Sequence, residues 1–357
     1  MKVRVAFVAE RPSQYLGPML RQLAQHVPLH VFYDSLGGAE SAFDPEFQTS
    51  FSWDVATLHG YPWERAKVAA VPWRLREFDA IIVHGVNRPI HWGAFWGAWH
   101  WGKRLLLRGE FMPTCRFPRL RRWLFGRIDG FLAIGTVARD TALEFGVPEN
   151  RIWMSPYAVD NDFFALRASQ ALQPPSDKRI IRERYGLSQE LPMVTMVGKL
   201  TSRKRPMDLL TACRGLDCSV LFVGDGPERP ALEREIRRVH ARAAITGFIN
   251  QTMLPAYYAA ADIFVMPSAW ESWGLSANEA MACGLPIILS EGVAATRDLT
   301  RGNGYTFPPG DIKRLRVLIR HLLLDDEERL EMGARSREIV RDFSIERAVA
   351  GILEALR

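Results

Sequence analysis

Two glutamates eight residues apart, Glu271 and Glu279, follow an apolar run and lie among small residues. Carboxylates accept hydrogen bonds from paired hydroxyls, so this pair suits a sugar or a ribose diol. Ser276 and Glu279 have the spacing of a capping box, which predicts that a helix begins there, and Gly284 and Pro286 predict its end. Free backbone amides at a helix start favour a phosphate. The alternative interpretation is a helix cap beside a solvated loop acid.

A basic loop follows the apolar run at 193–197. It places four cations within seven residues: Lys199, Arg203, Lys204 and Arg205. A lysine ammonium acts as a point charge, and an arginine guanidinium can donate two parallel hydrogen bonds, so the loop suits a diphosphate. A solvated basic turn has the same composition. The sequence has no G-x-x-x-x-G-K-[ST] motif, which excludes a P-loop ATPase.

Short apolar runs that alternate with helix-like stretches must position these loops. Such runs are typical of strands buried on both faces of a parallel sheet, joined by right-handed crossovers. A third loop, Gly224–Glu228, follows one of these runs and allows a tight turn, with or without a ligand. The expected strands are 3–9, 29–33, 80–84, 104–108, 130–134, 151–155, 193–197, 219–223, 243–247, 262–266 and 286–289.

The alternation predicts two Rossmann-like doubly wound α/β domains that face one another across a cleft. A segment poor in apolar residues, 168–191, is the expected linker. We therefore expect an N-terminal domain at 1–167, a C-terminal domain at 168–341, and a last helix, 342–357, that packs back on the first domain. A long aperiodic loop at 36–72 is too aromatic for a disordered segment, which favours a functional role.

Composition narrows the class of protein. The chain has 357 residues, 48% of them hydrophobic and 24% charged, which excludes a disordered or collagen-like chain. No apolar run is long enough to span a bilayer, and the N-terminus lacks the pattern of a secretory signal. Four cysteines form neither a disulfide framework nor a zinc motif. These features predict a cytoplasmic protein.

Together, in this order, the three loops resemble the C-terminal half of retaining family 4 glycosyltransferases (glycosyl transferases group 1), which have the GT-B fold. Glu271 and Glu279 match that family's E-x7-E motif, Gly198 to Lys204 its G-R/K-L-x-x-x-K motif, and Gly224–Glu228 its G-D-G-P-E motif. The resemblance is specific over 193–303. It extends to the rest of the chain through Tyr157–Phe163, which is similar to N-G-V-D-x-x-x-F.

The resemblance implies roles for single residues. Lys199 and Lys204 would hold the donor diphosphate and Glu271 the donor sugar, and these three would be the catalytic residues. Glu279 would bind the ribose diol, and Phe248 would lie against the base. The remaining donor-binding positions would be Gly17, Gly198, Ser272, Trp273, Gly274 and Leu275.

Two positions depart from the family pattern. Arg205 stands where the family commonly has glycine, and it either contacts phosphate or faces solvent. Family members often place a histidine after the strand that here ends at Arg108, and the sequence has none there, so Arg108 or Glu110 would occupy that place. His84, at the end of another strand, resembles a residue on the acceptor side, although a histidine at a strand end has the same appearance.

A basic and aromatic stretch lies at 92–127. Its tryptophans and its surplus of positive charge suit an anionic lipid surface, or else a packed aromatic helix followed by a solvated basic segment. No nucleic-acid-binding motif accompanies the charge. Between Trp101 and Arg127 there are one acid, Glu110, and eight basic residues: Lys103, Arg104, Arg108, Arg116, Arg119, Arg121, Arg122 and Arg127.

The resemblance therefore implies a retaining glycosyltransferase of cell-surface polysaccharide or glycoconjugate biosynthesis. It would move a sugar from a nucleotide-diphosphate sugar to a hydroxyl of a glycan, glycolipid or small-molecule acceptor. It implies no cofactor and no metal ion, since lysines replace the metal. Two alternatives stay open. One is a sugar-nucleotide epimerase or phosphorylase on the same fold, and the other is a donor-binding or scaffold protein that has lost catalysis.

Overall fold

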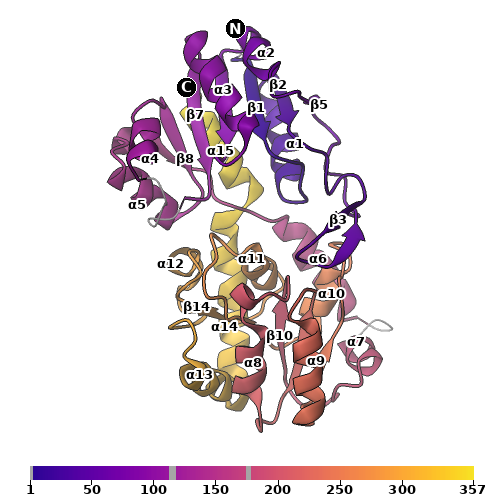
Figure 1. The fold of residues 1–357 in the computed structure, drawn as a ribbon. Coiled ribbons are helices and arrows are strands. Elements are labelled where there is room, and N and C mark those ends of the chain that lie inside the picture. The colour runs from indigo at the N-terminus through magenta and orange to yellow at the C-terminus, as the bar shows by residue number, and fades with distance from the viewer. Residues whose placement is uncertain (1–2, 112–117, 174–177) are drawn as a thin grey trace. The chain divides into compact units, whose positions relative to one another are not determined.

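The structure is a computed structural model, and it describes residues 3–111, 118–173 and 178–357. Contacts between residues divide the chain into two compact units (Figure 1). The first unit consists of Met1–Ala42, Phe51–Ala158 and Phe343–Arg357. The second unit consists of Phe43–Ser50 and Val159–Asp342.

The first unit contains a parallel sheet of seven strands in the order β5-β2-β1-β6-β7-β8-β9. The strands are β1 Val5–Ala9, β2 Leu29–Tyr33, β5 Trp63–Arg65, β6 Ala80–His84, β7 Arg104–Gly109, β8 Gly130–Ala133 and β9 Ile152–Met154. The helices are α1 Leu16–His26, α2 Val71–Arg74, α3 Pro89–His100, α4 Pro118–Phe125, α5 Thr136–Glu144 and α15 Ile345–Ala355, with 3-10 turns at Leu75–Glu77 and Glu149–Arg151.

The C-terminal helix α15 completes the core of the first unit. Its apolar face packs in the same core as Leu16 and Leu20 of α1. Gly351 lets the helix approach β9, because a Cβ there would lie 1.8 Å from the carbonyl oxygen of Met154. The hydroxyl of Ser155 also donates to the carbonyl of Ala348 at 2.9 Å. The last residues of the chain are therefore part of the first unit's fold.

The second unit contains a parallel sheet of six strands in the order β12-β11-β10-β13-β14-β15. The strands are β10 Met193–Val197, β11 Ser219–Val223, β12 Ala243–Ile245, β13 Ile263–Met266, β14 Ile287–Ser290 and β15 Gly304–Phe307. The helices are α6 Asn161–Ala171, α7 Lys178–Arg184, α8 Pro206–Cys213, α9 Arg229–Arg238, α10 Leu254–Ala259, α11 Leu275–Ala282, α12 Thr296–Leu299, α13 Ile312–Leu324 and α14 Asp326–Val340, with 3-10 turns at Ser202–Lys204 and Arg341–Phe343.

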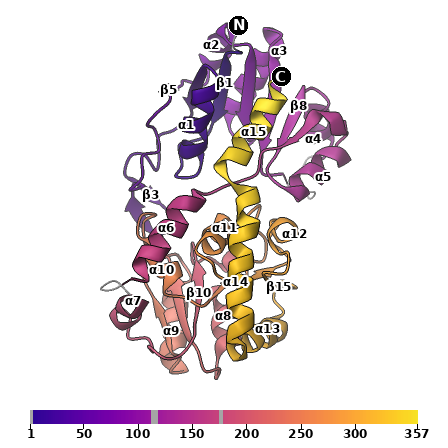
Figure 2. The same ribbon diagram turned by 180° about the vertical axis from the view of Figure 1, so that it is seen from behind.

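Helices cover the sheet of the second unit. On one side α8 and α13 pack together over Val194, Phe222 and Ile288, whose side chains are buried. The long helix α14, yellow in Figure 2, packs against α11. Apolar strands buried in this way explain why the sequence reads as short runs of Val, Ile, Leu and Phe.

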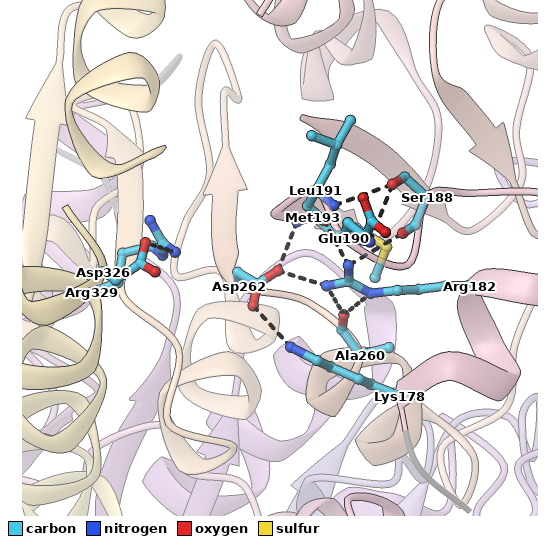
Figure 3. Close-up of polar contacts among 10 residues, drawn as sticks. All are labelled: Lys178, Arg182, Ser188, Glu190, Leu191, Met193, Ala260, Asp262, Asp326 and Arg329. Atoms are coloured by element: carbon cyan, nitrogen blue, oxygen red, sulfur yellow. Dashed lines mark hydrogen bonds and ion pairs between the residues drawn. The ribbon is translucent and has the colours of Figure 1, made fainter. Parts of the chain in front are cut away.

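A buried arginine anchors α7 to this sheet (Figure 3). Arg182 is 1% exposed, and its guanidinium donates to the carboxylate of Asp262 at 2.6 Å. It also donates to the carbonyl of Leu191 at 2.6 Å and to the carbonyl of Ala260 at 3.0 and 3.2 Å. The same Asp262 carboxylate accepts from the backbone amide of Met193 at 2.7 Å. The network ties the chain entering β10 to the chain entering β13.

The expected strands are present with small differences at their ends. Four strands of the described residues were not predicted: β5, β15, and the pair β3 (Ala42–Asp44) and β4 (Thr49–Phe51). The predicted domain boundary at 167 is wrong, because α6 belongs to the second unit, where the buried Phe164 packs against Tyr258 at 6.2 Å between ring centroids. Part of the expected linker, 174–177, lies outside the described residues. Among the described residues no helix combines the length and apolar character that crossing a membrane requires.

Candidate functional site

The sheet order of the second unit predicts where a ligand would bind. From β10 the chain runs outward to β11 and β12, then returns to place β13 on the other side of β10. Ligands of such sheets bind beyond the carboxyl ends of the strands at this reversal. Gly198 follows β10 directly, and Glu271 lies in the loop after β13. Two of the loops selected from the sequence therefore leave the sheet at the same point.

Backbone packing explains the glycines of these loops. Gly198 has a φ of 135° and Gly224 a φ of 144°, values that favour glycine. A Cβ on Gly224 would lie 2.0 Å from the carbonyl oxygen of Gly198, so the loops after β10 and β11 touch through their backbones. Gly224 is thus required for the packing of the loops and Gly198 for its backbone conformation, whether or not a ligand approaches them.

Glu271 lies between two cations from the basic loop. Its carboxylate is 2.5 Å from Nζ of Lys204 and 2.7 Å from the guanidinium of Arg203. The side chains of Glu271 and Lys204 are only 14% and 11% exposed. Burial raises the pKa of Glu271, but Lys204 and Arg203 outweigh it and leave that pKa below its ordinary value. The carboxylate is therefore ionised at neutral pH and fixed beside two permanent cations.

Lys199 has different partners from Lys204. Its Nζ lies 3.0 Å from the carboxylate of Asp44, the last residue of β3, and 2.6 Å from that of Glu46 in the turn that follows. The two lysines that were predicted to hold one diphosphate are thus each paired with carboxylates.

The helix after Glu271 begins two residues earlier than the predicted capping box requires, and that capping box is wrong. Helix α11 starts at Leu275 with Gly274 as its N-cap, in the left-handed region at φ 100° and ψ 60°. Ser276 therefore lies inside the helix, and its side chain does not cap it. The predicted end is confirmed: the helix stops at Ala282, and Gly284 has a φ of 84°.

Glu279 is held within the second unit by an aromatic hydroxyl. The carboxylate is in a residue 1% exposed and accepts a hydrogen bond from the hydroxyl of Tyr258 at 2.7 Å. Trp273, also buried, donates its indole N–H to the side-chain oxygen of Asn278 at 2.9 Å. Trp273 thus fixes the loop through its side chain, while the neighbouring Ser272, Gly274 and Leu275 form the turn into the helix.

The backbone conformation at position 205 explains why the family commonly has glycine there, and the arginine of this chain has a local partner. Arg205 has a φ of 52° and a ψ of 48°, the left-handed conformation that glycine adopts at no steric cost. Its guanidinium donates to the carboxylate of Asp208 at 2.5 Å. Arg205 is thus paired locally at the start of α8.

Two other predicted donor contacts are placed as follows. Gly17 lies in α1 and is buried, and a Cβ there would lie 2.7 Å from the carbonyl oxygen of Thr57. This close packing accounts for the glycine within the first unit. Phe248 follows β12, and its ring meets that of Phe47 edge-on, with 5.1 Å between centroids.

Two of the residues predicted on the acceptor side meet in the first unit. His84 and Arg108 pair across β6 and β7, and the guanidinium of Arg108 is 3.5 Å from Nδ1 of His84. Arg108 is 2% exposed and donates to the hydroxyl and carbonyl of Ser155, both at 3.1 Å. Glu110, in contrast, is exposed just beyond β7. Arg108 therefore holds the chain after β9 in place.

Burial controls the charge of this cluster. It lowers the pKa of His84 well below its ordinary value, and the charge of Arg108 adds to the effect. His84 is therefore neutral at pH 7, with Nε2 3.4 Å from the hydroxyl of Tyr157. A neutral imidazole beside a buried guanidinium can accept one hydrogen bond and donate another without adding charge.

Sequence reasoning missed several residues that the structure brings to these sites. Asp44, Glu46 and Phe47 come from the long aperiodic loop, whose only signal was its length and aromatic content. Tyr258 carried no signal, because a tyrosine in an apolar stretch is typical of a core residue. Tyr157 was noted only as the first residue of the stretch similar to N-G-V-D-x-x-x-F.

Known proteins resemble the chain in both sequence and structure. Residues 177–339 match the family model described as glycosyl transferases group 1. A D-inositol 3-phosphate glycosyltransferase of Xylanimonas cellulosilytica is 30% identical over 61% of this chain and 54% of the relative. The lipopolysaccharide core biosynthesis mannosyltransferase LpsB of Rhizobium meliloti is 29% identical over 66% of this chain and 68% of the relative. The chain thus spans about half the length of the first of these relatives.

The fold also matches a solved structure along its length. The Anabaena protein Alr3699/HepE, solved in complex with UDP and glucose, superposes with a TM-score of 0.77 at 17% identity, over 99% of both chains. The two Rossmann-like units are those of the GT-B fold, which confirms the predicted fold class. In sequence, the second unit of this chain is similar to the glycosyl transferases group 1 family over residues 177–339.

Proposed function

We propose that the protein is a glycosyltransferase that moves a sugar from a nucleotide-diphosphate sugar to a hydroxyl group. The observation that carries the proposal is the cluster of Arg203, Lys204 and Glu271 at the carboxyl edge of β10 and β13. It offers fixed cations for a leaving diphosphate and a carboxylate for sugar hydroxyls. The family match of the surrounding residues supports the same assignment.

In this proposal each group performs one task. Lys204, Lys199 and the amides at the start of α11 stabilise the charge that develops on the departing diphosphate. Glu271 accepts hydrogen bonds from the donor sugar, and its pairing with Lys204 keeps it ionised. Glu279, oriented by Tyr258, accepts from the ribose diol. Phe248 lies against the base.

Retention of anomeric configuration and independence of metal ions belong to the same proposal. Cations supplied by side chains can take the place that a divalent ion has at other diphosphate sites. We expect transfer to continue in excess EDTA, because no step then depends on a bound metal. The measurement is the rate of nucleoside diphosphate release with donor and acceptor, with and without EDTA. A loss of activity that Mg²⁺ or Mn²⁺ restores would contradict the proposal.

The acceptor proposed is a glycan, a glycolipid or a small molecule of cell-surface polysaccharide or glycoconjugate synthesis. The relatives are named for an inositol phosphate and for the lipopolysaccharide core, which are phosphorylated or lipid-borne acceptors. In the first unit the neutral ring of His84 accepts from Arg108 through Nδ1, so we propose that its Nε2–H donates a hydrogen bond to an acceptor hydroxyl.

We further propose that the first unit rests on anionic membrane at the inner face of the cell membrane. Helices α3 and α4 expose Trp96 and Trp123, 46% and 41% exposed, and Trp123 packs against Trp99 at 5.5 Å. Arg119 and Arg122 of α4 are exposed beside them. Exposed tryptophans among cations suit a headgroup layer. Arg116 of the same basic stretch lies outside the described residues.

The double variant Arg119→Gln, Arg122→Gln should bind vesicles with anionic lipid about 30-fold more weakly, since each surface cation contributes about 1 kcal/mol there. The measurement is co-sedimentation with phosphatidylglycerol vesicles, with phosphatidylcholine vesicles for comparison. Leu330→Ala on α14, which removes an exposed apolar side chain from the second unit, is the matched control. Equal binding of the double variant and the control would contradict the proposal.

A further inference from the structure

The segment between β3 and β4 lies on the predicted donor loops of the second unit. Its contacts assign residues 43–50 to that unit, although the chain on either side belongs to the first. Nζ of Lys199 donates to both carboxylate oxygens of Asp44, at 3.0 and 3.2 Å, and to Glu46 at 2.6 Å. Two carboxylates thus form ion pairs with one lysine of the proposed diphosphate site.

The same segment covers the aromatic group predicted to meet the base. The ring of Phe47 meets that of Phe248 at an angle of 75°. Nζ of Lys199 lies 5.0 Å from the centroid of Phe47, so this ring contacts both groups. The backbone of Glu46 reaches the third loop, since a Cβ on Gly226 would lie 2.9 Å from the carbonyl oxygen of Glu46. We call residues 44–47 the hairpin tip.

The hairpin tip is shaped by its own hydrogen bonds. The carboxylate of Asp44 accepts from the backbone amides of Glu46 at 2.8 Å and Phe47 at 3.1 Å. Burial raises the pKa of Asp44, but Lys199 and these amides outweigh it and leave that pKa below its ordinary value. The stability from this pairing is present above the unfolded-state pKa and is lost only as the pH falls through the lowered value. A change of pH near neutrality therefore does not release Lys199.

We infer that the hairpin tip competes with the donor: its two carboxylates hold Lys199 in place of the diphosphate, and Phe47 covers Phe248 in place of the base. The inference rests on the proposed function, because it takes these two residues as donor contacts. Two carboxylates resemble a diphosphate in charge and in their acceptor oxygens. A donor that binds must displace the hairpin tip, so the observed affinity is reduced by the fraction of molecules in which the tip is bound.

Inorganic pyrophosphate is the probe, because it carries the charge of the diphosphate without a base or a sugar. We expect Asp44→Asn, Glu46→Gln to bind pyrophosphate about 3- to 10-fold more tightly in titration calorimetry, since two partly exposed ion pairs no longer compete. The matched control, Glu331→Gln, Glu338→Gln, removes two exposed carboxylates of α14 and tests for the change of net charge alone. It should bind like the unchanged protein.

Pyrophosphate affinity that does not increase in the hairpin-tip variant overturns the inference. If the Asp44, Glu46 variant binds pyrophosphate equally or more weakly while Lys204→Ala weakens binding, the hairpin tip is part of the site and does not compete. If Lys204→Ala leaves pyrophosphate binding unchanged, the donor site itself is contradicted, and the inference falls with it. In a second measurement, pyrophosphate should speed hydrogen exchange of the peptide spanning 42–51, and slower exchange would contradict displacement.

Discussion

Lys204→Ala is expected to lower kcat/KM for sugar transfer by about 1000-fold, because it removes a fixed cation from the place where the leaving diphosphate gains charge. The ammonium of Lys204 is only 11% exposed and lies 2.5 Å from Glu271, so water cannot easily take its place. The variant also leaves Glu271 paired with Arg203 alone. Initial rates of nucleoside diphosphate release measure the effect.

Two controls separate chemistry from folding in that experiment. Lys313→Ala removes an exposed lysine from α13 of the same unit and should not change the rate. Lys204→Arg keeps the charge and should retain part of the activity. The planar, delocalised guanidinium is a poor substitute for the compact ammonium of lysine. Circular dichroism should show a folded Lys204→Ala protein. A Lys204→Ala rate equal to that of the Lys313→Ala control would contradict the assignment.

Arg182→Met is expected to destabilise the second unit by about 3 kcal/mol, since it leaves Asp262 without its nearest cation and buried carbonyls without donors. For a unit of this size the loss corresponds to a fall of about 10 °C in the unfolding temperature, measured by calorimetry. Lys178, 3.6 Å from Asp262, compensates only in part.

The second pair in Figure 3 supplies the control for Arg182. Arg329 pairs with Asp326, whose side chain is 83% exposed. An ion pair with so exposed a partner contributes little, and among the described residues Arg329 donates to only one carbonyl, that of Leu322, so Arg329→Met should lower the unfolding temperature less than Arg182→Met. A larger loss in Arg329→Met would show that the Arg182 network does not anchor α7.

The sequence predicted elements well where a single physical pattern determined them. Strands such as Met193–Val197 are buried on both faces, so their apolar runs are visible without a structure. The short strand Gly304–Phe307 was missed because only Phe307 in it is fully buried. The capping box was wrong because Gly274, in the left-handed conformation, starts α11 in place of a side-chain cap.

The part of the site that depends on contacts between distant segments of the chain could not be predicted from the sequence. The charges of Lys204 and Glu271 and their positions after two strands indicated a common site, and the structure brings them into contact. Nothing local indicated that Asp44 and Glu46, more than 150 residues before Lys199, would pair with it. Likewise, Arg108 appeared as a strand-end residue, whereas its donors are used by Ser155 and Pro156.

The central claim, sugar transfer from a nucleotide donor, is tested most directly by following the anomeric proton signals by NMR during the reaction. With UDP-, GDP-, ADP- or dTDP-sugars, we predict that one donor is consumed only when an acceptor is present, and that the product keeps the donor's anomeric configuration. Conversion of the donor without acceptor would indicate an epimerase, and reversal that depends on phosphate would indicate a phosphorylase. A donor that binds but is never consumed would indicate a scaffold, and any of these three results would contradict the account.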